Sequence, residues 1–307
     1  MKYYMAPLEG ITTYVYRNAH HKCFGAMDQY FTPFIVPHKD KRFNTRELKE
    51  LSPEHNNGLH VIPQLLTNDS EDFLATAKEI VQMGYREINL NLGCPSKTVV
   101  TKKKGSGFLA YPEELDRFLC EIFEKAEFEI SVKTRVGKDD YQEFPNLLRI
   151  YNKYPIKELT IHPRIQADYY QNKPNIETFE FAYLESKNPV CYNGDICTRE
   201  DLHTLEEQFP NLTSVMIGRG LIADPGMLWG LKKETLYEFH QEILEEYIRI
   251  SSEERNVLFK MKELWFYMIS LFEDAEKIAK KIKKCEKIKE YEEAVRLLFD
   301  TCRLREE

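Results

Sequence analysis

The feature that most constrains this chain is an alternation of short apolar runs with amphipathic stretches through residue 218. A strand that is followed by a helix and then by another strand is typical of a parallel sheet. Eight such strands predict an α/β fold of the closed (β/α)8 TIM-barrel type. The predicted strands cover residues 3–6, 29–31, 61–66, 87–91, 130–134, 159–162, 190–193 and 215–218.

The stretches between these runs have helical spacing. Phe73, Ala77 and Ile80 fall on one face of a helix over 70–83, and Gly84 is a typical stop. Pro112 suits the first turn of a helix over 112–126. We also expect helices over 201–209 and 224–231.

The pattern changes after residue 235, because strand-like runs stop and Gly and Pro are absent. Segments rich in Lys and Glu predict helices over 236–250, 254–272 and 274–304. We therefore expect a barrel domain over 1–235 and a smaller C-terminal all-helical domain over 236–307.

Composition narrows the class of protein. The longest apolar runs fall well short of the ~20 residues of a membrane span, and the N-terminus lacks the apolar core of a signal peptide. The seven cysteines show no metal-ligand spacing. These features predict a cytoplasmic protein that binds neither membrane nor metal, and we take a monomer as the default expectation. The net charge of −7 argues mildly against an RNA partner, although charge must also be considered locally.

Polar residues gather at the predicted strand ends, and in a TIM barrel the C-terminal strand ends carry the active site. Several such ends converging on one mouth favour a site over solvated termini. The residues concerned are Pro7, Gln64, Asn91, Cys94, Lys133, His162, Asn193, Asp195, Gly218 and Arg219.

The run over 87–91 ends in Gly93-Cys94-Pro95, which puts a thiol on a turn just past a strand. A cysteine there is placed for chemistry, although free cysteines are often buried. Lys133 lies inside the barrel if Val132 faces the helices, and a lysine there needs an anionic or electron-rich partner such as a flavin ring.

Two glycine-containing segments suit phosphate binding. Asn193-Gly194-Asp195 follows the seventh predicted strand and Gly218-Arg219-Gly220 the eighth, which is the usual phosphate position of this barrel. A plain turn with a surface arginine is the alternative.

Two lysine clusters suit a nucleic-acid backbone, and a solvated helix face is the alternative for the second. The first follows Cys94 and contains Lys97, Lys102, Lys103 and Lys104. The second contains Lys277, Lys280, Lys281, Lys283, Lys284, Lys287 and Lys289.

Taken in order, these motifs resemble those of the tRNA-dihydrouridine synthases. The resemblance rests on the segments 5–12, 64–65, 89–95, 102–107, 132–137, 161–164, 193–196 and 216–220. Two departures lie at Pro163, where the family commonly has glycine, and at 172–175, where a Gly-x-Ala-Asp-Trp-like run is usual.

The resemblance implies an FMN-dependent enzyme that uses NADPH to reduce a uridine in tRNA to 5,6-dihydrouridine. Hydride would pass from FMN N5 to C6 of uracil, and Cys94 would protonate C5. Asn91 and Arg164 would contact the uracil, and the C-terminal helices would bind tRNA. FMN would be held by Ala6, Pro7, Gln64, Lys133, His162, Asn193, Asp195, Gly218 and Arg219.

Two alternatives stay open at this point. One is an FMN-dependent dehydrogenase of a free pyrimidine, of the dihydroorotate or dihydropyrimidine type. The other is a tRNA-binding module without catalysis.

Overall fold

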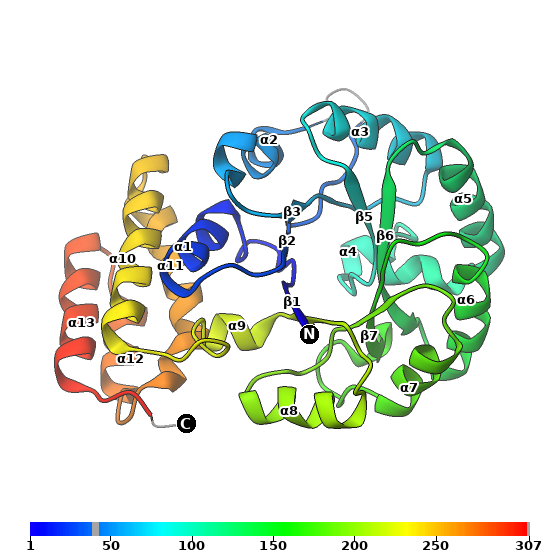
Figure 1. Cartoon of the computed structure of the whole chain (residues 1–307). Coiled ribbons are helices and arrows are strands. Elements are labelled where there is room, and N and C mark those ends of the chain that lie inside the picture. Colours follow the sequence, from blue (N-terminus) through cyan, green and yellow to red (C-terminus); the bar gives the residue numbers. More distant parts are fainter. Residues whose placement is uncertain (39–42, 306–307) are drawn as a thin grey trace. The chain divides into compact units, whose positions relative to one another are not determined.

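The computed structural model describes residues 1–38 and 43–305, which form two compact units (Figure 1). The first unit contains Met1–Pro7, Met27–Asp195 and Leu205–Ile217. The second contains Leu8–Ala26, Ile196–Thr204 and Gly218–Glu307.

All strands of the described residues belong to the first unit and form one parallel sheet in the order β3-β2-β1-β9-β8-β7-β6-β5-β4. The strands are β1 (Lys2–Met5), β2 (Gln29–Phe31), β3 (Val61–Ile62), β4 (Gln64–Leu65), β5 (Glu87–Leu92), β6 (Glu129–Gly137), β7 (Leu159–Ile165), β8 (Val190–Tyr192) and β9 (Ser214–Ile217).

The two outermost strands of this sheet are halves of one predicted strand, over 61–66, which Pro63 interrupts. Proline has no N–H to give to a ladder, so the strand divides at that residue. Ile62 of β3 pairs with Phe31, and Gln64 of β4 pairs with Asn89. One continuous segment thus joins both edges of the sheet, which confirms the predicted (β/α)8 barrel.

The register of β5 and β6 places polar residues side by side. Asn89 lies opposite Ser131, and Asn91 lies opposite Lys133. Because successive side chains of a strand alternate in direction, Leu90 points to the other face of the sheet. The buried apolar residues and the buried amides of β5 therefore lie on opposite faces, and the amides end near one barrel mouth.

Helices of the first unit lie between the strands, and α8 begins in the second unit and ends in the first. The predicted helices over 70–83, 112–126 and 201–209 are confirmed as α3, α5 and α8. The helical elements are α2 (Thr45–Leu51), η1 (Pro53–Asn56), α3 (Ser70–Gln82), α4 (Lys97–Val100), η2 (Gly105–Ala110), α5 (Pro112–Lys125), η3 (Tyr141–Glu143), α6 (Phe144–Tyr151), η4 (Gln166–Asp168), α7 (Ile176–Glu185) and α8 (Arg199–Gln208).

The rest of the second unit is helical and is held by a buried polar contact. Trp265 Nε1 donates to the Tyr291 hydroxyl at 2.7 Å, and that hydroxyl lies 2.7 Å from His240 Nε2. Burial lowers the pKa of His240 to about 3, so its ring is neutral. The elements are α1 (Tyr14–Phe24), α9 (Arg219–Ala223), α10 (Lys233–Ile250), α11 (Glu254–Met268), η5 (Ile269–Leu271), α12 (Glu276–Lys284) and α13 (Ile288–Thr301).

The predicted helix over 224–231 is wrong. The chain forms turns there, because α9 ends before Pro225 and the Asp224 carboxylate accepts a hydrogen bond from the Gly226 N–H. Gly230 has a φ of 91°, which a helix does not allow.

The segment 274–304 forms two helices rather than the single one predicted. The chain leaves α12 at Cys285, and the extended backbone of Lys287 at the N-cap position precedes α13. The domain boundary expected between residues 235 and 236 stays a prediction. Within the described residues, helices of the length and hydropathy that a bilayer requires are absent.

Candidate active site

A chain of buried amides runs across the strand ends of the first unit. Asn91 Nδ2 donates to Gln64 Oε1 at 2.7 Å, and Gln64 Nε2 donates to Asn89 Oδ1 at 2.7 Å. Asn89 Nδ2 then donates to Ser131 Oγ at 2.9 Å. Each amide fixes the orientation of the next, so Gln64 and Asn91 are held rigidly.

The Cys94 turn is held from both sides. The Asn91 side-chain oxygen accepts hydrogen bonds from the N–H groups of Gly93 at 3.0 Å and Cys94 at 2.9 Å. The Cys94 carbonyl accepts from the N–H of Ser106 at 3.1 Å and from its hydroxyl at 2.8 Å. The Cys94 side chain is half-buried, so a fixed backbone presents a thiol that is not sealed in the core.

The fold of this turn requires glycine at position 105. Gly105 has a φ of 56°, and a Cβ there would lie 2.8 Å from the Cys94 carbonyl oxygen. Such a distance is shorter than van der Waals contact. Glycine therefore lets the loop that follows Cys94 fold back against it.

Arg135, to which no role was assigned from the sequence, joins three segments of the barrel mouth. Its guanidinium donates to the carbonyls of Gly93 at 3.0 Å, Ile165 at 2.8 Å and Tyr169 at 2.8 Å. The side chain is 2% exposed. The turn before Cys94 is thus tied to the end of β7 and to the segment after it.

Lys133 is a cation without a countercharge in this site. Among residues 1–38 and 43–305 it forms no ion pair, and burial together with the charge of Arg135 lowers its pKa to about 8. The thiols of Cys94 and Cys191 oppose this shift. A desolvated ammonium of this kind is stabilised by an anionic or electron-rich ligand.

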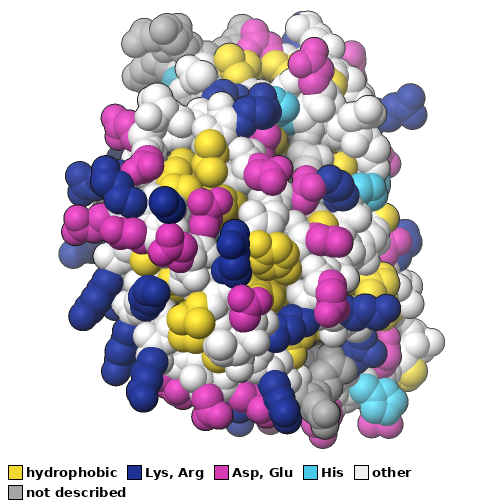
Figure 2. Space-filling view, turned by 90° about the vertical axis from the view of Figure 1, so that its left-hand side faces the viewer, with side chains coloured by type: hydrophobic (Ala, Val, Ile, Leu, Met, Phe, Trp, Pro, Cys, Tyr) yellow, Lys and Arg dark blue, Asp and Glu magenta, His cyan; other side chains and the backbone are white. Residues whose placement is uncertain are grey.

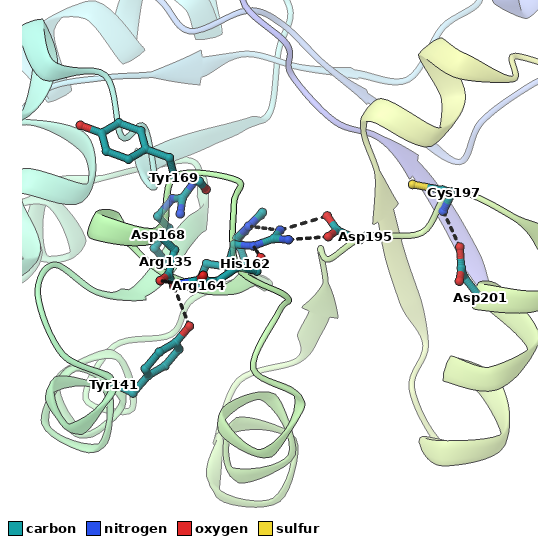
Figure 3. A network of polar contacts seen from close by, with 10 residues as sticks. Arg135, Tyr141, His162, Arg164, Asp168, Tyr169, Asp195, Cys197 and Asp201 are labelled. Carbon is teal, nitrogen blue, oxygen red and sulfur yellow. Dashed lines mark hydrogen bonds and ion pairs between the residues drawn. The ribbon is translucent and has the colours of Figure 1, made fainter. Parts of the chain in front are cut away.

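Arg164 and Asp195 form a bidentate ion pair at the ends of β7 and β8 (Figure 3). Arg164 Nη1 lies 3.0 Å from Asp195 Oδ1, and Nη2 contacts Oδ2. Nη1 also lies 3.1 Å from His162 Nε2, and Nε donates to the Asn172 carbonyl. These four contacts use all but one of the guanidinium N–H groups.

His162 is neutral in this arrangement. Burial and the charges of Lys133, Arg135 and Arg164 lower its pKa well below the usual value, while the hydrogen bond of its ring to the Asn193 side chain opposes this shift. Its Nε2 therefore accepts from Arg164, and its Nδ1 carries the proton.

The other predicted residues are distributed as follows. The Ala6 N–H donates to the Ile217 carbonyl at 2.8 Å, which places Ala6 and Pro7 where β1 leaves the sheet. Asn193 Nδ2 donates to the Met216 carbonyl at 2.8 Å. Gly218 and Arg219 belong to the second unit, as the N-cap and first residue of α9.

The lysines that follow Cys94 lie on α4 and the adjoining turn. Lys97, Lys102 and Lys103 are exposed, and Lys104 is half-buried. Lys103 Nζ lies 3.9 Å from the centre of the Tyr111 ring. This first lysine cluster is therefore largely available to a solvent-side partner.

Tyr170 is a second residue that was not assigned from the sequence. Its ring centre lies 6.0 Å from that of His162, edge-on, and the Arg135 guanidinium lies 5.3 Å above it. The side chain is 47% exposed. The only sequence signal was the pair Tyr169-Tyr170 in a loop after a predicted strand.

Groups of three or more His, Cys, Asp or Glu side chains that could hold a metal ion are absent from the part of the chain that the structure describes. The polar residues of the mouth are instead amides, cations, a neutral imidazole, a thiol and the Asp195 carboxylate, which is paired with Arg164. Such a donor set suits an organic ligand with carbonyl and ring-nitrogen groups.

Comparisons with known proteins agree with this geometry. A family model described as dihydrouridine synthase (Dus) matches residues 4–305. The chain is 29% identical over 240 residues to tRNA-dihydrouridine(16) synthase of Haemophilus influenzae, covering 75% of this chain and 76% of that protein. It is 25% identical over 245 residues to tRNA-dihydrouridine synthase B of Pasteurella multocida, covering 79% and 71%.

Solved structures support the fold. Histamine dehydrogenase from Rhizobium sp. 4-9 matches with a TM-score of 0.55 at 12% identity, over 88% of this chain and 51% of that one. The old yellow enzyme from Trypanosoma cruzi matches with a TM-score of 0.51 at 8% identity, over 78% and 92%. At these identities the likeness shows a common barrel architecture alone.

The contact between Gly105 and Cys94 generates a first prediction. We expect Gly105→Ala to lower the free energy of unfolding by about 2 kcal/mol or more, since it combines a positive φ with a clash against backbone. Gly58→Ala is the matched control, because Gly58 has a φ of 80° with no atom within 4 Å of a Cβ. Urea unfolding should show a loss of only about 1 kcal/mol in the control. Equal losses would contradict the clash.

Arg135 generates a second prediction. Arg135→Met removes the donors of three carbonyls while keeping an apolar stem, so we expect a loss of about 3 kcal/mol or more in the free energy of unfolding. Arg149→Met, on the exposed surface of α6, should change it by less than about 0.5 kcal/mol. Similar urea midpoints for the two variants would show that Arg135 does not hold the mouth together.

Proposed function

The chain belongs to the dihydrouridine synthase family, and on that premise we propose that it reduces a uridine of tRNA to 5,6-dihydrouridine, with FMN as cofactor and NADPH as reductant. The observation that carries this proposal is Lys133, a half-buried cation without an ion pair among the described residues, close to the half-buried thiol of Cys94. We also propose that the enzyme is monomeric and cytoplasmic.

The donor set of the mouth fits a flavin. Lys133 would face its electron-rich N1–O2 edge, and the second amide N–H of Gln64 would hydrogen-bond a carbonyl or ring-nitrogen group. The ring nitrogens of neutral His162 are engaged by Arg164 and Asn193, so His162 would hold the flavin by van der Waals contact. Asp195 would act mainly through Arg164, because both of its oxygens contact that guanidinium. The remaining residues proposed to hold FMN are Ala6, Pro7, Asn193, Gly218 and Arg219.

When bound, FMN supplies the hydride that adds to C6 of the uracil ring. The task of Cys94 is to hold a proton and give it to C5, and a thiol can do this at neutral pH. The hydrogen bonds of Asn91 and Ser106 to the backbone of Cys94 fix the position from which the proton is given.

The proposed substrate contacts use N–H donors that are not engaged in hydrogen bonds among the described residues of the site. Asn91 keeps one amide N–H that is not used in its bonds to Gln64 and the Cys94 turn, and Arg164 keeps one N–H on Nη2. We propose that these two N–H groups contact the uracil. The base must leave its stack to reach them, which costs about a few kcal/mol. Lys97, Lys102, Lys103 and Lys104 would neutralise nearby phosphates.

Replacement of the thiol tests the acid role. Cys94→Ala should leave the flavin content unchanged and lower the rate of dihydrouridine formation about 10²–10⁴-fold, the usual contribution of a general acid. Cys120→Ala, a half-buried thiol on α5, is the control. Dihydrouridine is measured by mass spectrometry of tRNA, with free uracil and orotate as alternative substrates. Wild-type speed in Cys94→Ala would reject the assignment, and preference for a free pyrimidine would reject the tRNA substrate.

The pKa of Lys133 predicts how flavin affinity depends on pH. Lys133 is charged below about pH 8 and neutral above it, while a bound electron-rich edge favours the charged form. Affinity for FMN should therefore be highest below pH 8 and fall roughly tenfold by pH 9.5. Quenching of flavin fluorescence on titration into flavin-free protein measures this.

Lys133→Met should bind FMN weakly at pH 7 and show no such fall, whereas Lys187→Met, an exposed lysine, should behave like the wild type. A pH dependence that persists in Lys133→Met would place the titrating group elsewhere.

A further inference from the structure

Two large aromatic side chains lie exposed on α11 in the second unit. Phe266 is 79% exposed and Phe259 is 67% exposed. They are seven residues apart, so they lie on one face of the helix, two turns from each other. Single exposed apolar residues are normal, but two aligned phenylalanines on one helix face call for a partner.

Cations accompany both rings. Lys262 lies between them on the same face, and its Nζ donates to the Cys285 carbonyl at 2.5 Å. Lys260 Nζ donates to the Gly10 carbonyl at 2.7 Å and lies 5.8 Å from the centre of the Phe259 ring. We refer to Phe259, Lys262 and Phe266 as the aromatic face.

The aromatic face adjoins the lysine-rich helix α12. The bond from Lys262 to Cys285 places it beside the C-terminal end of α12, and Lys287 lies 3.6 Å from Glu254 at the start of α11. The segment 276–289 contains seven lysines, all exposed, and only two acidic residues, Glu276 and Glu286. Figure 2 shows hydrophobic side chains interspersed with Lys and Arg, and with Asp and Glu, on one face of the molecule.

We propose that the aromatic face is a stacking platform for an unpaired base of tRNA, with the α12 lysines neutralising the phosphates beside it; this rests on the proposed function. Aromatic side chains beside a basic surface are the combination that binds unpaired nucleotides, because every base has a π face and every link a negative charge. A protein partner would gain little from seven lysines next to two phenylalanines unless it were strongly acidic. RNA supplies both complements at once.

Stacking and charge neutralisation have different salt signatures, which makes the proposal testable. In the holoenzyme, Phe266→Ala and Phe259→Ala should each weaken binding of unmodified tRNA transcripts about 5- to 100-fold, the range for losing one stacked base. The slope of log Kd against log salt should not change, because no charge is lost. The triple change of Lys280, Lys283 and Lys284 to Ala should instead flatten that slope.

Three controls separate stacking from other effects. Phe266→Tyr should keep wild-type affinity, whereas Phe266→Leu, which keeps an apolar side chain, should bind as weakly as Phe266→Ala. Leu184→Ala removes a 69% exposed apolar side chain from α7 and should change nothing. Flavin content and thermal unfolding should be the same in all variants, because the replaced side chains are exposed.

The outcomes are distinct. Unchanged affinity in both Phe→Ala variants, or full affinity in Phe266→Leu, would overturn the platform while leaving the proposed function standing. A concentration-dependent dimer in sedimentation velocity that the Phe→Ala variants abolish would also overturn it, in favour of an interface between two copies of the chain. If the wild-type holoenzyme binds no tRNA, the proposed function and the platform fail together.

Discussion

The described architecture of the site depends on one buried guanidinium. Arg135 donates to three carbonyls that come from different segments, two of which carry or adjoin a predicted site residue, while the third adjoins Tyr170. Gly93 precedes the thiol, Ile165 ends the strand of His162, and Tyr169 precedes the half-exposed Tyr170. A planar fork with fixed donor directions suits this task, whereas the single ammonium of a lysine does not.

A second constraint follows from the first, since Arg135 lies close to other cations. Lys133 and Arg164 occupy the same mouth, and Asp195 is engaged with Arg164. The local excess of positive charge keeps His162 neutral and makes the charge of Lys133 costly. The mouth is thus prepared for an electron-rich ligand, although the whole chain carries a net charge of −7. Local charge, and not the total, decides what such a site binds.

Much of the fold and the position of the site could be predicted from the sequence, because the spacing of apolar residues indicates the secondary structure and the strand ends indicate the barrel mouth. Apolar runs separated by amphipathic stretches define a parallel barrel, and the C-terminal strand ends define its mouth, so Gln64, Asn91 and Cys94 could be placed near one another. The predictions that failed concern helix boundaries, where local turn signals compete with helical periodicity. Pro225, Gly226 and Gly230 interrupt a segment with helical spacing, and α12 and α13 divide although no Gly or Pro separates them.

The ion pair and hydrogen bonds between residues of the site could not be predicted from the sequence. Arg164 and Asp195 were assigned separate ligand contacts, yet they bind each other across the ends of β7 and β8. Arg135 belongs to the same motif as Lys133, and the sequence does not show that its guanidinium contacts three backbone carbonyls. Contacts of this kind depend on register and loop path, and neither leaves a periodic signal.

The cation of Lys133, which forms no ion pair among the described residues, has a consequence for the stability of the folded chain. Partial burial makes the charged form of Lys133 less favourable in the folded chain, and a ligand that interacts with that charge stabilises the folded state by mass action. A ligand that places an electron-rich edge against Lys133 would therefore stabilise the folded chain as well as occupy its barrel mouth.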